Sequence, residues 1–555
     1  MDSSGDGRRA TGDGRRAVLF AARSANALHR LLDVLPVFAG DERVSRLFTL
    51  VPGSDFGVEA LAAVERARAH TIPWAEACQG SYDLVIAASP KGELWSLRGP
   101  RVLLPHGAGF GKSLPGEGAH DSASGLDPAF LVRDGETLAS FHALSHPSQL
   151  TRLAAASPRA AARAGVVGDP ALERILASVG RREEYRRALG TGARTLVVLV
   201  STWGPECLLR RRPGLPAELA ARLPYDAYQL GLILHPNERA HIGHLDLAEQ
   251  LAPALDAGLV LAGPYEEWCA LLIAADAVVT DHGSAALYAA ALDRPVVAAY
   301  DGGAELIPGS PMARLLARGP RLDAPGGLEA ALGAHRPGAT RAVAAAAFAE
   351  QGRALERLQE ELYGLLGLTP RSPARARILP SPPPPDRTPA AFAVRAETDG
   401  DEVRVERFPA HTGTPGHHLA AEHGTATERH ALSAGLLYRR ARPPLAAPHG
   451  AAWTAGAWTE HVLARYPGCR AAAAVLEDGR CLVRTRSGDL LAVRLGPAQD
   501  GGLVVTADPA AVLSAVHARL AARSGAPGSV RCLVGGRAFT VRLSPATAAD
   551  TECLL

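Results

Sequence analysis

The chain has 555 residues, of which 47% are hydrophobic and 21% are charged, and its formal net charge is +2. A chain of this length exceeds the size of one hydrophobic core, so we expect two or three domains, and this composition excludes a largely disordered protein. The nearly balanced charge gives no reason to expect nucleic acid as a partner.

The spacing of the cysteines and the hydropathy of the chain indicate the cellular compartment in which we expect the protein. The seven cysteines are scattered without a C-x-x-C pair, so neither a zinc site nor a disulfide framework is indicated, and a reducing cytoplasm fits best. No apolar run is long enough to predict a membrane-spanning helix. Arg15 and Arg16 precede a short apolar run, as in a twin-arginine signal, but Arg23, His29 and Arg30 interrupt that run. We therefore do not expect export.

In chain order, a polar tail at 1–16 leads into a first series of strands and helices. Short apolar runs, which suit buried strands, alternate with stretches of helical periodicity. Such alternation predicts a parallel, doubly wound sheet, in which ligands bind beyond the carboxyl ends of the strands. We assign this first Rossmann-like domain to 17–170, with strands at 18–22, 44–51, 83–87 and 102–104.

A second series of the same kind predicts a second Rossmann-like domain at 171–368. Its expected strands lie at 196–200, 230–234, 259–261, 277–280 and 296–299. Apolar residues of the segment 342–366 recur at helical spacing, which predicts a closing helix that crosses back over the first domain.

The last part of the chain begins with a Pro-rich linker at 369–389. Four consecutive prolines favour a semi-rigid spacer across which few contacts pass. Turn signals at Asp478-Gly479 and Gly535-Gly536 then predict an accessory α+β domain with antiparallel strand pairs at 390–555. Its histidines lack ligand spacing, so solvated loop residues are favoured over a metal site. We expect neither a metal nor a cofactor in this chain.

The stretch 274–300 carries the strongest local signal. An apolar run at 277–280 predicts a strand, Asp281-His282-Gly283-Ser284 predicts a turn, and an Ala-rich run at 285–292 predicts a helix. Backbone N–H groups and the helix dipole at such a corner favour an anion such as a phosphate. The alternative is that Ser284 only caps the helix and Gly283 only permits the turn.

His106 stands in a Gly-rich loop, 105–113, directly after the expected strand at 102–104. The first glycine of this loop comes one place too late for a Walker A motif, so a P-loop is not expected. A histidine titrates near neutral pH, and glycines let a ligand approach closely, so His106 is a candidate acid or base. The alternative is an ordinary solvent-exposed loop histidine.

Over 17–366 the order and spacing of these motifs resemble the GT-B glycosyltransferases. Within that fold they most resemble the bacterial CDP-glycerol glycerophosphotransferases of wall teichoic acid synthesis. The resemblance rests on His106-Gly107 with Lys112, Thr202-Trp203, His235-Pro236, Asp281 with Ser284, and Arg294-Pro295-Val296. These match that family's His-Gly loop ending in lysine, its Pro-Thr-Trp, its His-Pro, the ends of its Asp-Tyr-Ser-Ser, and its Lys-Pro-Val.

Two loops depart from the family pattern. His282-Gly283 replaces Tyr-Ser, which moves this turn toward the His-Gly-Gly loops of nucleotide-sugar glycosyltransferases. Ala108-Gly109-Phe110 replaces Thr-Pro-Leu on the acceptor side. The donor can therefore be CDP-glycerol or a nucleotide-sugar.

The resemblance implies a transferase that moves a glycerophosphate or a glycosyl group from a nucleotide-diphosphate donor to an acceptor hydroxyl. Such a reaction serves cell-envelope polymer or glycoconjugate synthesis. The chain would then be cytoplasmic or peripheral at the inner membrane face, with a lipid-linked acceptor as one form of substrate. The alternative is a non-catalytic nucleotide-binding or regulatory protein that keeps the fold. The implied site has His106 as base, Gly107 and Lys112 on the acceptor side, and donor contacts from Thr202, Trp203, His235, Asp281, His282, Gly283 and Ser284.

Overall fold

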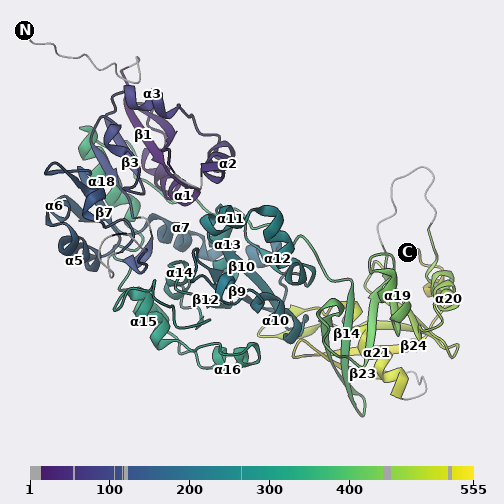
Figure 1. Cartoon of the computed structure of the whole chain (residues 1–555). Helices are drawn as coiled ribbons and strands as arrows, with labels where there is room; N and C mark the ends of the chain where they lie inside the picture. The colour runs from purple at the N-terminus through teal and green to yellow at the C-terminus, as the bar shows by residue number, and fades with distance from the viewer. Residues whose placement is uncertain are drawn as a thin grey trace, which may run out of the picture.

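The computed structural model describes 14–53, 57–105, 107–114, 117, 123–263, 265–441, 452–522 and 528–555. Most of the expected polar tail lies outside these residues. The described chain forms three successive units, drawn in Figure 1 from purple through teal to yellow. Within the described segments, none of the helices is both long enough and apolar enough to cross a bilayer.

The first unit is built on a sheet in the order β2-β1-β3-β4-β7-β8, and every neighbouring pair in it is parallel. All of β1 except its first residue is buried, as expected of a central strand covered on both faces. The strands are β1 (Arg16–Ala22), β2 (Val44–Leu50), β3 (Leu84–Ala87), β4 (Arg101–Leu103), β7 (Phe141–Leu144) and β8 (Ala164–Val166). The helices include α1 (Ala25–Val34), α2 (Gly57–Ala67), α3 (Trp74–Gln79), α4 (Pro128–Leu131), α5 (Pro147–Ala156) and α6 (Pro158–Ala161).

The second unit repeats the pattern with a sheet in the order β11-β10-β9-β12-β13, again wholly parallel. Its strands are β9 (Thr195–Ser201), β10 (Tyr228–Leu234), β11 (Val260–Leu261), β12 (Ala277–Thr280) and β13 (Val296–Ala298). Its helices include α7 (Pro170–Ser178), α8 (Arg182–Ala188), α9 (Leu208–Arg211), α10 (Leu215–Arg222), α11 (Pro236–Ile242), α12 (His244–Asp256), α13 (Glu267–Ala274), α14 (Ala285–Ala291), α15 (Pro311–Arg318) and α16 (Leu328–Gly333). The prediction of two parallel sheets is confirmed, and β7 and β8 extend the first sheet beyond the predicted strands.

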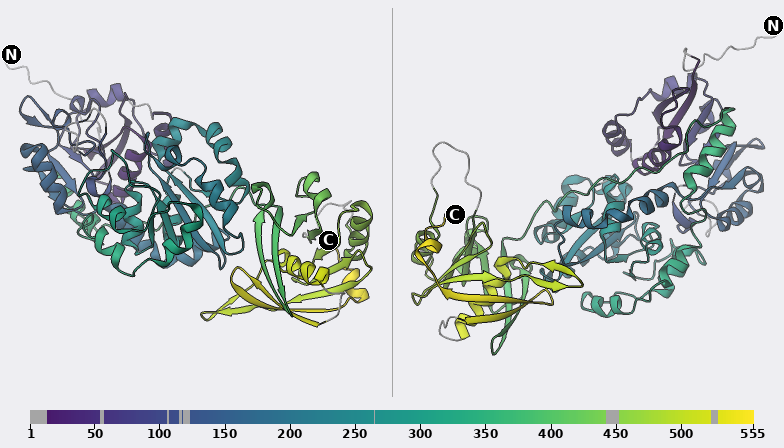
Figure 2. Two further views of the ribbon diagram at one scale, coloured as in Figure 1. Left: turned by 60° about the horizontal axis from the view of Figure 1, so that its bottom comes forward. Right: turned by 180° about the vertical axis from the view of Figure 1, so that it is seen from behind.

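The predicted closing helix is divided into α17 (Ala339–Ala344) and α18 (Ala354–Leu366). Gly352, with a φ of 78°, lies in the break between them. Leu355, Leu358 and Leu362 of α18 are part of the hydrophobic core of the first unit. Figure 1 and the right view of Figure 2 both show this green helix beside the purple and blue first unit. The expected crossing back to the first domain is therefore confirmed, although the helix is shorter than predicted.

The segment 369–381, which we call the strap, packs on the core instead of acting as a spacer. Leu379 is only 2% exposed and belongs to the core of the second unit. Its N–H donates to Ser178 Oγ at 3.0 Å, and its carbonyl accepts from the hydroxyl of Tyr185 at 2.9 Å. Farther back, the Ser372 carbonyl accepts from Gln359 on α18 at 3.1 Å. Proline content alone could not distinguish such an anchored segment from a spacer.

Because Leu379 anchors the strap, Leu379→Ala should lower the free energy of unfolding by about 2–3 kcal/mol. The adjacent Ile378 is 43% exposed, so Ile378→Ala is a matched control and should change it by less than about 0.5 kcal/mol. Urea unfolding of the full chain measures both. Equal effects of the two substitutions would contradict an anchored strap.

The third unit is a closed barrel among the described residues, in the order β14-β15-β23-β24-β20-β19-β18-β17-β16. The strands are β14 (Ala391–Asp399), β15 (Glu402–Pro409), β16 (His418–Glu422), β17 (Leu436–Arg440), β18 (Ala471–Val475), β19 (Cys481–Thr485), β20 (Leu490–Leu495), β23 (Gly528–Val534) and β24 (Arg537–Pro545). The helices α19 (Glu428–Ser433), α20 (Ala455–Arg465), α21 (Pro509–Ala522) and α22 (Ala548–Thr551) accompany them, with a side hairpin of β21 (Ala498–Asp500) and β22 (Leu503–Val505).

The antiparallel pairs predicted at the two turns are present as β18–β19 and β23–β24, but the barrel also contains parallel ladders that were not predicted. β15 pairs with β23, β16 with β17 and β17 with β18 in parallel, while the remaining ladders are antiparallel. Helix α21 is buried continuously from Ala510 to His517 and joins the barrel core. The left view of Figure 2 shows α21 lying within the curve of the strands. The third unit thus has a core of its own.

The barrel also docks on the second unit through a buried ion pair. Arg407 on β15 is 0% exposed and binds Asp226 with two bonds, Nε to Oδ2 at 2.8 Å and a terminal nitrogen to Oδ1 at 2.6 Å. The backbone N–H of Tyr225 donates to the Arg407 carbonyl at 2.8 Å, and the rings of Tyr225 and Phe392 lie 5.1 Å apart. The expectation that few contacts cross into the third unit is therefore wrong, because this joint buries a charge that needs its partner.

Asp508 completes the joint and makes its stability sensitive to acid. It accepts from Arg407 at 2.8 Å and from Arg440 at 2.9 Å. Burial disfavours the ionised carboxylate, but the two arginines outweigh burial and lower the pKa of Asp508 to about 2. Because this pKa is depressed from 3.8, the stabilisation is present above about pH 4 and is lost as the pH falls toward 2.

Thermal unfolding of the full chain from pH 6 to pH 2 tests this acid sensitivity. The natural chain should lose melting temperature steeply below pH 4, whereas Asp508→Asn should melt lower at pH 6 and change less between pH 4 and 2. Parallel pH profiles of the two proteins would contradict the role of Asp508.

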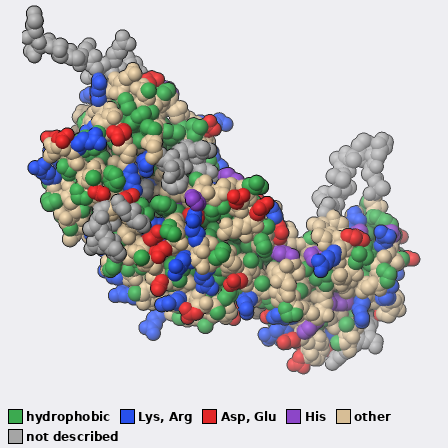
Figure 3. All heavy atoms as spheres, viewed as in Figure 1, with side chains coloured by type: hydrophobic (Ala, Val, Ile, Leu, Met, Phe, Trp, Pro, Cys, Tyr) green, Lys and Arg blue, Asp and Glu red, His purple; other side chains and the backbone are tan. Residues whose placement is uncertain are grey.

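Charged side chains are mixed over the surface drawn in Figure 3, with acidic and basic groups interspersed in all three units. That face lacks the single-sign field that steers a polyanion.

Candidate active site

A cleft opens where the first and second units meet, at the carboxyl ends of the second sheet. The space between its walls, open solvent included, is about 1360 Å³. Three neighbouring strands, β9, β10 and β12, each end at this cleft and supply the segments that follow them, as expected for parallel sheets. The wall opposite comes from α1 and from the loop after β4. Its lining includes Asn26, His29, Arg30, Asp33, Gly107, Lys112, Ser201, Thr202, Trp203, Ile233, His235, Trp268, His282, Gly283, Ser284 and Tyr288.

The structure brings most of the predicted site residues to this one cleft. Thr202 and Trp203 follow β9, His235 follows β10, and the turn at 282–284 follows β12. Gly107 and Lys112 line the cleft from the first unit. His106 lies outside the described residues, so its role stays a prediction, although its sequence neighbour Gly107 is part of the wall.

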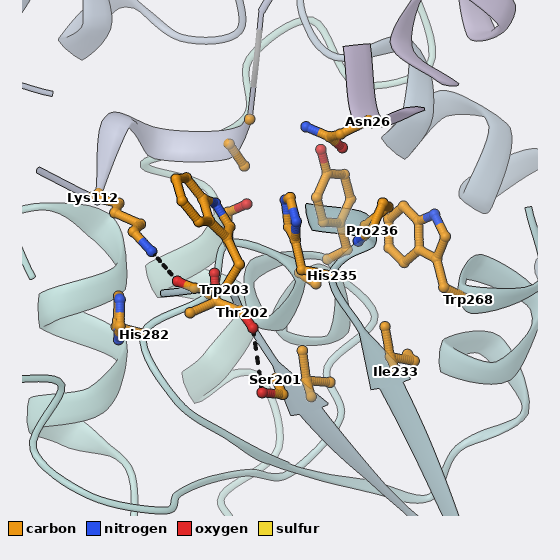
Figure 4. Close-up of a pocket in the computed structure, with 18 of the residues that line it drawn as sticks. Asn26, Lys112, Ser201, Thr202, Trp203, Ile233, His235, Pro236, Trp268 and His282 are labelled. Atoms are coloured by element: carbon orange, nitrogen blue, oxygen red, sulfur yellow. Dashed lines mark hydrogen bonds between the residues drawn. The ribbon is translucent and has the colours of Figure 1, made fainter. Parts of the chain in front are cut away.

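His235 is the central polar side chain in the close-up of Figure 4, with Trp203 and Lys112 to one side and Trp268 to the other. Its Nδ1 accepts the backbone N–H of Asn237 at 3.1 Å, which caps α11. This bond holds the orientation of the His235 ring, which lines the cleft.

Asp281 does not line the cleft, which corrects its predicted role as a donor contact. It is 0% exposed, and its carboxylate accepts three backbone N–H groups at 2.8 Å, those of Thr202, Leu208 and Gly283. Burial raises the pKa of its carboxyl above the ordinary value, against the lowering effect of His282 and of these amides. Asp281 holds the loops after β9 and β12 in register and acts on a ligand only through them.

Gly283 is likewise a structural residue, because its N–H is already bound to Asp281. An added Cβ would lie 3.0 Å from Cβ of Thr202, so a larger residue would push the two loops apart. The predicted contact between the Gly283 amide and a phosphate is therefore corrected. Ser284 differs, since its hydroxyl makes no capping bond in α14 and lines the cleft.

Lys112, which was predicted on the acceptor side, lies in the loop of the first unit and reaches across to the second unit. Its Nζ lies 3.0 Å from Oε2 of Glu305, donates to the Trp203 carbonyl, and stands 4.5 Å from the centroid of the Trp203 ring. The same carboxylate oxygen binds Nε2 of His282 at 3.0 Å. Lys112 of the first unit and His282 of the second unit were both predicted as site residues. They therefore bind the same carboxylate, that of Glu305, which was not predicted.

Sequence reasoning missed Glu305 and the α1 side of the cleft. Glu305 follows β13, so the strand-end rule that found the other residues also points to it.

On α1, His29 and Asp33 line the cleft. Burial lowers the pKa of His29 to about 4, which keeps it neutral, and burial raises the pKa of Asp33 to about 6 despite Arg174. Arg174 of α7 bridges Asp33 at 3.2 Å and Glu266 at 2.9 Å, which ties α1 to the second unit.

No model of a known protein family matches the sequence, and no curated protein matches it. Comparison with solved structures gives several matches. The wall teichoic acid polymerase TagF matches with a TM-score of 0.46 and 14% identity over 63% of this chain and 89% of that one. The Anabaena protein HepE in complex with UDP matches with a TM-score of 0.39 and 18% identity over 63% of this chain and 99% of that one. HepE in complex with UDP-glucose matches with a TM-score of 0.36 and 18% identity over 63% and 100%.

Proposed function

We propose that this chain is a transferase with two Rossmann-like domains in a GT-B layout. It moves a glycerophosphate or glycosyl group from a nucleotide-diphosphate donor to an acceptor hydroxyl. The observation that carries the proposal is the convergence of His235, Ser284 and Trp203 in one cleft, at three adjacent strand ends and facing a second α/β unit.

The donor binds on the second unit. The His235 ring and the Ser284 hydroxyl, which both line the cleft, contact the diphosphate, and hydrogen bonds to charged oxygens are among the stronger ones in proteins. Trp268 at one end of the cleft offers an apolar aromatic surface to the nucleoside. The buried Asp281 keeps Thr202 and Gly283 in place so that these groups stay aligned.

The acceptor enters from the first unit, and His106 takes the proton from its hydroxyl. In the glycerophosphate reaction the acceptor oxygen forms a bond to phosphorus, and the bond to the departing nucleoside monophosphate breaks. In the glycosyl reaction the oxygen attacks the anomeric carbon, and a nucleoside diphosphate leaves. A lipid-linked acceptor would place the chain at the inner membrane face.

Phosphorus NMR distinguishes these outcomes. The full chain is incubated with CDP-glycerol or UDP-glucose and with glycerol, glycerol phosphate or glucose as acceptor. Release of CMP identifies glycerophosphate transfer, and release of UDP identifies glycosyl transfer. His106→Ala should abolish either release while leaving donor affinity nearly unchanged. Donor binding without any release would instead support a non-catalytic nucleotide-binding protein.

A further inference from the structure

One carboxylate joins the two walls of the cleft. Oε2 of Glu305 lies 3.0 Å from Nζ of Lys112, in the loop of the first unit, and 3.0 Å from Nε2 of His282, in the turn after β12. The three side chains come from three separate segments. They are all largely buried, with exposures of 6% for Glu305, 16% for Lys112 and 0% for His282.

The backbone around Glu305 continues this contact. The N–H of Ser113 donates to the Glu305 carbonyl at 2.8 Å, and the N–H of Ile307 donates to the Gly111 carbonyl at 3.0 Å. Lys112 and Leu306 therefore face each other as an isolated antiparallel bridge. The backbone bonds do not depend on the charge of Glu305, so a substitution of that side chain alone need not open the cleft.

We propose that Glu305 is a positioning residue that sets the acceptor-side loop against the donor turn, by sharing one carboxylate oxygen between Lys112 and His282. This inference rests on the proposed function. Glu305 orients His282 through its ring, and Lys112 in turn lies over Trp203, so the carboxylate fixes a side chain on each wall of the cleft. The position of the acceptor relative to the donor follows from that alignment.

Because the Glu305 carboxylate is buried, its contacts with Lys112 and His282 are energetically costly to lose. A buried carboxylate is costly unless it is paired, so removal of either partner leaves the Glu305 carboxylate with fewer bonds. Burial works against ionisation of Glu305, but His282 and Lys112 outweigh it and hold the carboxyl pKa below its ordinary value. Its second oxygen, Oε1, is buried and bonded to no other described residue, which leaves Lys112 and His282 as the side chains that bind the carboxylate.

Trp203 supplies a spectroscopic readout of this contact, because the Lys112 ammonium stands over its ring. The difference in emission between each protein and its Trp203→Phe counterpart isolates this tryptophan from the other five in the chain. Glu305→Gln and Lys112→Met should each shift the Trp203 emission without any nucleotide, and the double variant should shift it no more than Lys112→Met alone. Lys91→Met, which removes the only other lysine and its pairing with Glu117, is the control and should leave the emission unchanged.

Measurement of catalytic turnover provides a second test of the role of Glu305. Glu305→Gln should lower kcat about 10- to 100-fold through misplacement of the reactants, while the donor KM changes less than about threefold. Lys112→Arg, which keeps the charge, should recover most of the activity lost in Lys112→Met.

Unchanged Trp203 emission in Glu305→Gln, or fully additive effects in the double variant, would overturn the positioning role. Failure of turnover in every protein, with the emission shifts as expected, would instead count against the transferase and leave the contact through Glu305 established.

Discussion

His235→Ala should weaken binding of a nucleoside diphosphate by about 10- to 100-fold, because a hydrogen bond to a charged group contributes about 1.5–3 kcal/mol. The Nδ1 of His235 accepts the Asn237 amide, so the ring is already held in its orientation at the cleft before a ligand binds. The substitution also removes the cap of α11. Isothermal titration calorimetry with CDP and UDP measures the loss, and circular dichroism checks that the helices remain.

His241→Ala provides the matched control for this experiment. His241 lies on the same short helix, is exposed, and does not line the cleft. Its substitution should leave nucleotide affinity within a factor of about two. Equal loss of affinity in both variants would show that α11 stability, and not the His235 ring, governs binding.

Asp226→Ala should destabilise the joint between the barrel and the second unit by about 3–5 kcal/mol, because it leaves the buried Arg407 guanidinium without its main partner. Arg407 retains Asp508, but its two-bond contact with Asp226 is lost. We expect the third unit to unfold in a separate transition at lower urea concentration than in the natural chain. Urea titration followed by circular dichroism and by tryptophan fluorescence resolves the two transitions.

Asp256→Ala is the control, since Asp256 makes an exposed ion pair with Arg387 near the same joint. Exposed pairs contribute about 0–1 kcal/mol, so this variant should behave like the natural chain. A chain that ends at Thr369 would lose the strap as well as the barrel, and we expect it to be less stable than the full chain. If Asp226→Ala proves as stable as Asp256→Ala, the joint does not hold the barrel in place.

The sequence predicted the two parallel sheets because most of their strands are short, continuous apolar runs that alternate with helices. β1 and β9 are buried over nearly their whole lengths, which is the condition under which that pattern is unambiguous. β7 and β8 were missed because they are short and contain His142 and Gly165, which interrupt the apolar pattern.

The barrel could not be predicted from local pattern. Its closure depends on β15 pairing with β23, which lies more than a hundred residues later in the chain, in parallel register. The Asp478-Gly479 turn predicted the β18–β19 hairpin correctly, since that pairing is local. Turn residues specify the pairing of strands that are adjacent along the chain, whereas closure of the barrel depends on packing around α21.

The candidate site was predicted in part, because several of its residues directly follow strands that the sequence predicts. Thr202, Trp203, His235 and Ser284 follow strand ends, and parallel sheets bring those ends together. The distinction between Asp281, which holds loops, and Ser284, which faces the cleft, depends on tertiary burial that no local pattern records. Glu305 follows β13, but its contact with Lys112 joins two units of the fold, and no local pattern records such a contact.

Calorimetric titration of the full chain with CDP, UDP, CDP-glycerol and UDP-glucose tests most directly whether the cleft binds a nucleotide donor. We predict saturable binding of at least one diphosphate at one site per chain, and a matching loss of affinity in His235→Ala but not in His241→Ala. Absence of binding for all four ligands, or binding that His235→Ala leaves unchanged, would contradict the assignment of this cleft as the donor site.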